Sequence, residues 1–282
     1  MTENKIIKGF YAYSANPPDL SETIENAVSE INQKLTGTVE VRSWRSFIKS
    51  GNSVINQVCR DIDDSDFFIC DLTKLSMNVL FELGYAIARE KRIWLTLDSS
   101  QEDSKRQYKR LSPLSNVTCC YYQNSLDLSN KFLSEQPYND LKSTLFDSFI
   151  AELIENEPDF PHLFYLKSGL PTEASVRLTK HINKSSISKV VDDPEEAPSQ
   201  TLGWYSKNVY YSVGVVAHFL DENRQNEEQT IRNAKNALVS GLAHGFDKPV
   251  LMLAHFPFTA PVDFRNFLHV HETAKSCTEI ME

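Results

Sequence analysis

Asp66-Phe-Phe-Ile-Cys-Asp71, Asn78-Val-Leu-Phe-Glu-Leu-Gly-Tyr-Ala-Ile-Ala-Arg-Glu90 and Arg92-Ile-Trp-Leu-Thr-Leu97 follow one another closely and indicate the fold more strongly than any other part of the chain. The first segment is apolar at successive positions, as is typical of a strand buried on both faces of a parallel sheet. The second has apolar residues at helical spacing, and the third is again a short apolar run. A strand, a helix and a strand in this order predict a right-handed crossover within a parallel sheet.

The same alternation continues on both sides of these segments. Apolar runs predict further strands, and apolar residues at helical spacing predict further helices. The strands are expected at residues 6–13, 39–44 and 117–122, and the helices at residues 20–35, 53–62 and 138–155. Five strands alternating with helices predict an α/β three-layer fold with a mainly parallel sheet, in a flavodoxin-like or related doubly wound arrangement.

A second cycle begins after Asn156-Glu-Pro-Asp-Phe-Pro161, a polar, proline-containing segment that indicates a domain boundary. Strands are expected at residues 162–166, 186–191, 213–220 and 248–254, and helices at residues 172–182, 202–210 and 231–246. We therefore predict two tandem Rossmann-like domains, residues 1–156 and residues 157–282. The second cycle shows no fifth strand before Glu282, so we expect that domain to be truncated and the chain to be a fragment of a longer protein.

The two halves resemble each other at the helix that leads to the fourth strand. Residues 78–95 align with residues 235–252, and the alignment pairs Gly84 with Gly241, Ala86 with Ala243 and Lys91 with Lys248. This is the signature of an internal repeat. The second copy has Val239 where the first has Glu82, so we expect it to be degenerate and catalytically silent.

Composition excludes several classes of protein. The chain has 282 residues, of which 41% are hydrophobic, and a formal net charge of −9. This apolar content excludes wholesale disorder, and the acidic balance argues against a nucleic-acid partner. No apolar run approaches the roughly 20 residues that span a bilayer, and the first residues lack the pattern of a signal peptide. The five Cys residues show no CxxC spacing, which favours a reducing compartment, so we expect a cytoplasmic protein.

Ligands of open parallel sheets bind beyond the carboxyl ends of the strands. Six residues at such positions in the first half are candidates for binding or catalysis: Tyr11, Ser14, Trp44, Asp71, Asn78 and Glu82. Asn78 and Glu82 are four residues apart and share one face of the expected helix. Two alternatives stay open: Glu82 forms a partly exposed ion pair, and Tyr11 and Trp44 pack in the core or at its rim.

The second half offers weaker signals. Asp221, Asn223 and Arg224 follow an expected strand and are candidate ligand contacts, with a solvated turn as the alternative. His269 and His271 can share one face of a strand, but no third ligand with zinc spacing lies nearby, so no metal site is predicted. The glycine-rich loops that cradle phosphates are absent, which argues against an oxidoreductase or an NTPase.

The first half resembles two related families, the TIR and TIR-like domains and the nucleoside 2-deoxyribosyltransferases. The central match consists of Asp71-Leu-Thr73, Asn78-Val-Leu-Phe-Glu-Leu-Gly-Tyr-Ala86 and Lys91-Arg-Ile-Trp-Leu95. Shorter TIR-type signatures are Tyr13-Ser14, Ser50-Gly51 and Ser65-Asp66. The transferases likewise have an Asp at the end of a strand, followed by an FELG-type helix. The resemblance covers about residues 6–97.

Both families cleave or transfer at the N-glycosidic bond of a nucleoside or nucleotide. The resemblance implies that Glu82 attacks or stabilises the anomeric carbon, that Asp71 and Asn78 hold ribose hydroxyls, and that Tyr11 or Trp44 stacks on a base. The implied function is an N-glycosidase, a hydrolase or transferase that acts on NAD or a related nucleotide as an effector in bacterial antiphage defence. No cofactor is implied, because NAD enters as a substrate.

Two other functions stay open. The degenerate second copy favours a non-catalytic module that senses a nucleotide or recruits a partner within a larger defence protein. TIR-type self-association is a third interpretation.

Overall fold

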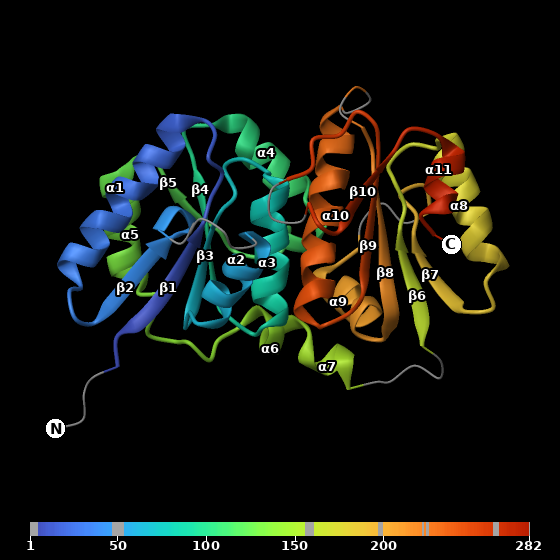
Figure 1. The fold of residues 1–282 in the computed structure, drawn as a ribbon. Helices are drawn as coiled ribbons and strands as arrows, with labels where there is room; N and C mark the ends of the chain where they lie inside the picture. Colours follow the sequence, from blue (N-terminus) through green and yellow to red (C-terminus); the bar gives the residue numbers. More distant parts are fainter. Residues whose placement is uncertain are drawn as a thin grey trace.

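The computed structural model describes residues 5–46, 54–155, 161–196, 200–221, 223, 226–261 and 265–281. These residues form an α/β structure with two five-stranded parallel sheets, each covered by helices on both faces (Figure 1). The prediction of two tandem Rossmann-like three-layer units is confirmed. The predicted boundary between residues 156 and 157 lies outside the described residues.

The first sheet has the strand order β2-β1-β3-β4-β5. Its strands are β1 (Ile7–Ala12), β2 (Val39–Ser43), β3 (Phe67–Asp71), β4 (Arg92–Asp98) and β5 (Cys120–Tyr122). The helices α1 (Pro18–Lys34) and α5 (Ser125–Glu135) cover the outer face, and α2 (Val54–Asp63), α3 (Met77–Ala88) and α4 (Glu102–Arg110) lie on the other side (Figure 1). Short helical turns are η1 (Trp44–Ser46), η2 (Ser112–Leu114), α6 (Leu145–Phe149) and α7 (Ala151–Ile154).

The second sheet has the order β10-β9-β8-β6-β7, the same winding as the first. Its strands are β6 (His162–Leu166), β7 (Ser188–Asp192), β8 (Ser212–Phe219), β9 (Val250–His255) and β10 (Leu268–His271). The helices α8 (Glu173–Lys184) and α11 (Ala274–Glu279) cover its outer face, and α9 (Leu202–Tyr210) and α10 (Glu227–Gly245) face the first sheet (Figure 1).

Two predictions about these elements are wrong. The second sheet does have a fifth strand, β10, which is only four residues long and has two histidines, so it lacks the apolar run that marks a buried strand. The single helix expected at residues 138–155 is replaced by two short helices, α6 and α7. The chain also forms α5, which Asn124 caps by accepting a hydrogen bond from the amide of Asp127 (2.9 Å) and which ends at Gln136 in a left-handed conformation.

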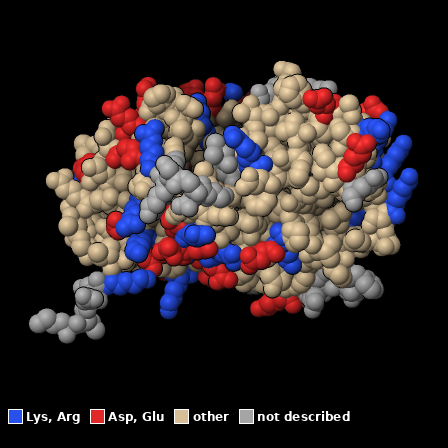
Figure 2. Space-filling model, viewed as in Figure 1, with Lys and Arg blue, Asp and Glu red and all other residues tan. Residues whose placement is uncertain are grey.

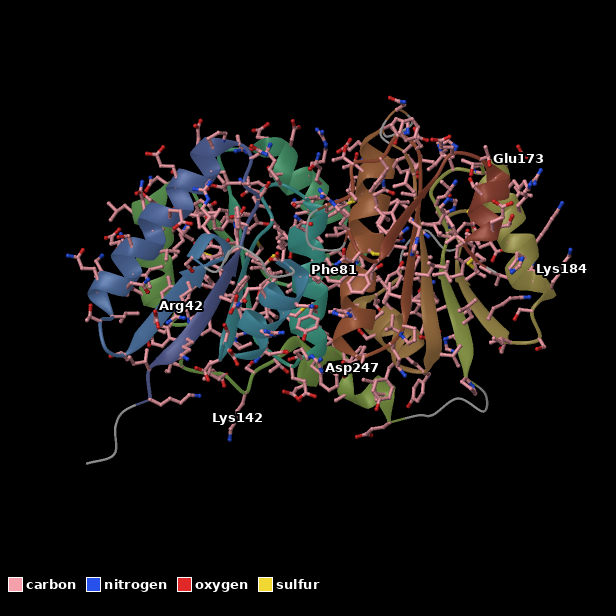
Figure 3. The ribbon with its side chains drawn as sticks, in the orientation of Figure 1. Arg42, Phe81, Lys142, Glu173, Lys184 and Asp247 are labelled. Atoms are coloured by element: carbon pink, nitrogen blue, oxygen red, sulfur yellow. The ribbon has the colours of Figure 1, made fainter. Side chains whose placement is uncertain are left out.

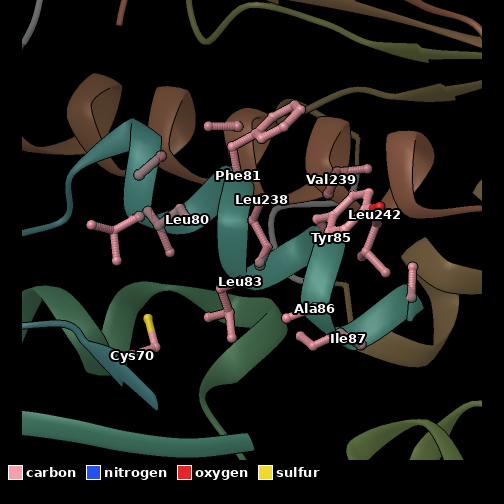
Figure 4. Close-up of a cluster of buried hydrophobic side chains, with 14 of the residues drawn as sticks. Cys70, Leu80, Phe81, Leu83, Tyr85, Ala86, Ile87, Leu238, Val239 and Leu242 are labelled. Atoms are coloured by element: carbon pink, nitrogen blue, oxygen red, sulfur yellow. The ribbon is translucent and has the colours of Figure 1, made fainter. Parts of the chain in front are cut away.

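One hydrophobic cluster joins the two sheets. It runs from Phe68 and Leu83 in the first unit through Leu238 on α10 to Phe164 and Val215 in the second. Smaller separate clusters lie under the outer helices. Figure 4 shows the centre of the joining cluster, where α3 directs some side chains toward its own sheet and others toward α10. The two three-layer units therefore pack against each other through the helices that lie between their sheets.

The seam between the two units is held by close contact between α3 and α10, the helices of the internal repeat. A β-carbon added to Gly84 would lie 2.0 Å from the carbonyl oxygen of Leu238, and one added to Gly241 would lie 1.9 Å from that of Phe81. Figure 3 shows Phe81 at this seam between the units. The two glycines occupy equivalent positions of the repeat, as do Phe81 and Leu238. The contact is therefore approximately two-fold symmetric, like that of a homodimer.

The ends of the two helices also repeat. Glu90 and Asp247 both adopt left-handed backbone conformations, with φ of 55° and 57°. In each helix the next amide donates a hydrogen bond to the carbonyl five residues back: Lys91 to Ala86 (3.0 Å) and Lys248 to Ala243 (2.9 Å). An ion pair between Arg89 and Asp247 (3.0 Å) links these ends across the seam. The aligned glycines, alanines and lysines thus have matching structural roles.

The surface carries charges of both signs. On the face shown in Figure 2, Lys and Arg side chains are interspersed with Asp and Glu. Arg42 and Glu40 form one such exposed pair (2.7 Å), of a kind that contributes at most about 1 kcal/mol to stability. Among the helices in the described part of the chain, none combines the length and the apolar character that crossing a membrane requires.

The glycine contact predicts the effect of Gly84→Ala. Helix propensity alone would stabilise this variant by about 1 kcal/mol. The added methyl group instead meets a backbone oxygen, so we expect a net loss of about 2–3 kcal/mol in the free energy of unfolding. Urea denaturation measures the change. Gly214→Ala is the comparison and should cost less stability, because its β-carbon would lie 3.2 Å from the nearest atom, a tight contact but not an overlap. A Gly84→Ala protein more stable than the wild type would contradict the packing argument.

Candidate functional site

A hollow of about 620 Å³ lies between the two units, at the carboxyl ends of their strands. The first unit contributes Ser14, which follows β1, and Asn78, in the first turn of α3. The second contributes Thr230 and Asn233 from the N-terminal part of α10. Two of the six predicted residues of the first half therefore line one hollow, which we call the interdomain hollow.

Glu82 lies deeper along α3 than the interdomain hollow. It is one helical turn beyond Asn78, or about 6 Å along the axis, and its side chain is buried, with 5% of the residue exposed. Burial, together with the charges of Asp63 and Glu82, raises the pKa of Cys59 on α2 to about 12. Glu82 also raises the pKa of Cys70 on β3, after the larger effects of burial and Asp71. The carboxylate therefore lies on the side of α3 that faces α2 and β3.

Asp71 is the centre of a buried hydrogen-bond network at the end of β3. Its carboxylate accepts hydrogen bonds from the Tyr122 hydroxyl (2.8 Å), the Thr96 hydroxyl (3.1 Å) and the Thr73 amide (3.0 Å). The Tyr11 hydroxyl bonds to Thr96 (2.9 Å) and extends the network to β1. Burial raises the pKa of Asp71 to about 6, although these hydrogen bonds oppose the rise.

The network lies on the outer face of the first sheet. Successive side chains of a strand point to opposite faces, and Cys70 belongs to the cluster that faces α3. Asp71 therefore points toward α1 and α5, away from the face that α3 covers. Tyr11 is fully buried in the outer cluster. The structure thus brings Tyr11 and Asp71 together and places them on the other side of the sheet from Glu82.

Ser14 and Trp44 occupy different surroundings. The Ser14 hydroxyl donates to the carbonyl of Asn16 (2.8 Å) and shapes the turn after β1. Trp44 is half-buried in η1, with its ring 5.9 Å from that of Tyr13 and the Arg45 guanidinium 5.6 Å from its centre. Trp44 therefore packs at the rim of both the joining cluster and the outer cluster. Its predicted stacking on a base stays a prediction.

The structure describes only two of the second-half candidates. Asp221 is buried after β8, where its carboxylate lies 3.6 Å from Nδ1 of His255. Asn223 is exposed, and Arg224 lies outside the described residues. The proposed ligand contacts of these three residues stay predictions.

Sequence reasoning missed a basic hollow of about 520 Å³ between α4 and the carboxyl edge of the second sheet. Four of its lining residues are basic and one is acidic: Lys109, Arg110, Arg232, Lys235 and Glu228. The α4 side is tied to the second unit by Glu227, which pairs with Arg106 (3.0 Å) and Arg110 (3.1 Å). No motif in the sequence marks this hollow, because Arg232 and Lys235 lie in an otherwise ordinary helical pattern.

The buried cations of the basic hollow converge on a single carboxylate. Asp192, at the end of β7, pairs with Arg232 (3.0 Å) and with Lys235 (3.2 Å), and only 5% of each cationic residue is exposed. Burial and then the charge of Arg232 lower the pKa of Lys235 to about 8, against the opposing effect of Asp192. Nη1 of Arg232 is buried with no hydrogen-bond partner among the described residues. Two cations facing one anion leave a positive excess, which suits an anionic ligand.

The pKa of Asp71 predicts how stability depends on pH. Its folded value of about 6 exceeds the ordinary value of 3.8, so folding favours the protonated form. The contribution of protonated Asp71 to the free energy of unfolding is therefore fully present below about pH 4 and is lost as the pH rises through about 6. Relative to Asp71→Asn, we expect the wild type to lose about 2 kcal/mol between pH 4 and pH 7 in urea denaturation. A difference independent of pH would show that Asp71 ionises normally.

Comparisons with known proteins add no family to this description. Neither the protein-family models nor the curated proteins that were searched gave a match to the chain. The resemblance to TIR-like domains and deoxyribosyltransferases therefore rests on the residues quoted above.

Proposed function

We propose that the first unit is an N-glycosidase that acts on NAD or a related nucleotide, with Glu82 as its catalytic carboxylate. The observation that carries this proposal is the position of Glu82. It is a buried carboxylate one turn below Asn78, on the helix that begins at the interdomain hollow. A hollow of about 620 Å³ falls within the range of small-molecule sites.

The chemistry suits a buried carboxylate. Cleavage of the base–ribose bond passes through an oxocarbenium-like transition state, which a nearby anion stabilises or captures as a covalent intermediate. Apolar surroundings strengthen that interaction, because few water dipoles screen the charges. In this proposal the ribose lies along the face of α3 that carries Asn78 and Glu82. Water then completes hydrolysis, or a second base completes a transfer.

The other predicted residues hold the substrate or position the segments around it. Asn78 and Ser14 line the interdomain hollow and are suited to hold ribose or phosphate oxygens. Asp71 acts as a positioning residue, because its hydrogen bond to the Thr73 amide shapes the segment that leads from β3 to α3. An effector role in antiphage defence, a cytoplasmic location and activation by self-association belong to the same proposal, on the strength of the resemblance.

Glu82→Gln tests the catalytic assignment. The wild type is incubated at low and high concentration with NAD and a panel of nucleosides and nucleotides, and the released base is measured by chromatography. We expect the variant to lose at least about 100-fold in rate, because the amide cannot supply the negative charge. Glu22→Gln on α1 is the matched control, because Glu22 is exposed and α1 covers the opposite face of the sheet from α3. Base release that survives in Glu82→Gln would refute the assignment.

The basic hollow favours a second function, the binding of a nucleotide or another phosphate-bearing ligand by the second unit. Its supporting observation is the buried pair Arg232 and Lys235 with the single carboxylate of Asp192. Such a site would let the second unit sense a ligand without catalysing a reaction. It is compatible with the glycosidase, because the two hollows have separate linings.

Lys109→Ala tests the sensing function without disturbing the buried ion pairs, because Lys109 is exposed on α4. Calorimetric titration with inorganic phosphate and with a nucleoside triphosphate measures affinity. We expect a weakening of about 10-fold, since a hydrogen bond to a charged group contributes about 1.5–3 kcal/mol. Lys105→Ala, on the same helix but outside the hollow, should bind as the wild type does. Equal affinity in both variants would place any binding elsewhere.

A further inference from the structure

Three potential metal ligands meet beneath α11, on the outer face of the second sheet. His218 is near the end of β8, His271 is the last residue of β10, and Cys277 is on α11. Their ligand atoms, one nitrogen from each imidazole and the thiol sulfur, all lie within 4.8 Å of one another. The exposed fractions of the three residues are 1%, 1% and 0%. We call this group the His–His–Cys cluster.

The distance between the two imidazoles matches a tetrahedral zinc site. Nε2 of His218 lies 3.3 Å from Nε2 of His271. Zinc–nitrogen bonds of about 2.0–2.1 Å at the tetrahedral angle place two ligand nitrogens about 3.3–3.4 Å apart. The two rings therefore already present the same type of nitrogen to each other at the separation that a shared ion needs.

The surroundings of the cluster provide few other partners for these polar atoms. It borders an apolar cluster that includes Leu178, Leu253 and Ala274. A hydrogen bond between the two rings satisfies only the two facing nitrogens. An ion would bind both nitrogens and the thiolate of Cys277, and so would make use of all three buried groups.

A further donor lies close to the cluster. The ring of His255, the last residue of β9, is centred 5.3 Å from that of His271. Its Nδ1 donates a hydrogen bond to the carbonyl oxygen of Phe256 (2.6 Å), so Nε2 is the nitrogen available to a metal ion. The ends of β8, β9 and β10 thus each present an imidazole near α11.

We propose that His218, His271 and Cys277 bind a zinc ion, with His255 or water as the fourth ligand. Nitrogen and thiolate donors in a tetrahedral set are the combination that zinc prefers, whereas magnesium and calcium prefer oxygen donors. The ion replaces the proton of the Cys277 thiol, which passes to solvent. Its role is structural, because it ties the short helix α11 to two strands of the sheet.

The test begins with the intact chain. Protein purified without metal-affinity resin is analysed for bound metals, then stripped with a chelator and titrated with zinc, magnesium and calcium separately. We expect a stoichiometric amount of zinc and a higher unfolding temperature with zinc alone. Substitution with cobalt should give the charge-transfer absorption of a cobalt–thiolate bond, a signature that needs no variant.

Two variants assign the ligands. Cys277→Ser keeps the size of the side chain and His271→Asn keeps a polar planar group, and each should weaken zinc binding by at least about 100-fold, because even loss of an outer-shell partner costs about 10- to 100-fold. The controls are His269→Asn, an exposed residue of the same strand, and Cys59→Ser, a buried cysteine of the first unit. Both controls should bind zinc as the wild type does.

Circular dichroism of the stripped proteins checks that each variant folds. If His271→Asn does not fold, Cys277→Ser and the cobalt spectrum of the wild type still decide the question. A wild type that neither contains zinc nor gains stability from it would overturn the proposal and leave the two imidazoles as a hydrogen-bonded pair. Zinc retained at full affinity by both ligand variants would also overturn it, because the ion would then bind elsewhere.

Discussion

The contact between α3 and α10 is the feature that fixes the arrangement of this protein. At Gly84 and Gly241 each helix approaches the other so closely that a β-carbon would overlap a backbone oxygen. Apolar side chains around the two glycines then join the cores of both sheets into one cluster (Figure 4). Tight packing of this kind allows few alternatives, so the two units have one defined relative orientation.

The relative orientation of the two units determines where ligands can bind. The approximate two-fold symmetry turns the carboxyl edges of both sheets to the same side of the molecule (Figure 1). The interdomain hollow consequently combines loops of the first unit with the start of α10, and the basic hollow combines α4 with the edge of the second sheet. Neither hollow belongs to one unit alone. An isolated first unit would lack Thr230 and Asn233 from the wall of the interdomain hollow.

The ends of the predicted strands located the candidate residues along the chain but not the face of the sheet on which each one lies. The sequence placed Asp71 and Glu82 near the carboxyl edge of the sheet, which agrees with the positions of β3 and α3. It did not reveal that Asp71 points to the outer face, where Tyr122 and Thr96 bond to it. The face depends on the phase of a two-residue alternation, and a strand that is apolar on both faces gives no sign of that phase.

Local patterns in the chain were enough to predict the α/β class, the alternation of strands and helices, and the repeat that pairs Gly84 with Gly241, because periodicity and motifs are properties of neighbouring residues. They missed β10, whose four residues contain no apolar run. The meeting of distant residues, Arg232 with Asp192 and His218 with His271 and Cys277, became visible only in the folded chain. Each of these groups comes from separate elements, and the order of strands in the sheet brings them together. That order is set by long-range packing, which no short stretch of sequence encodes.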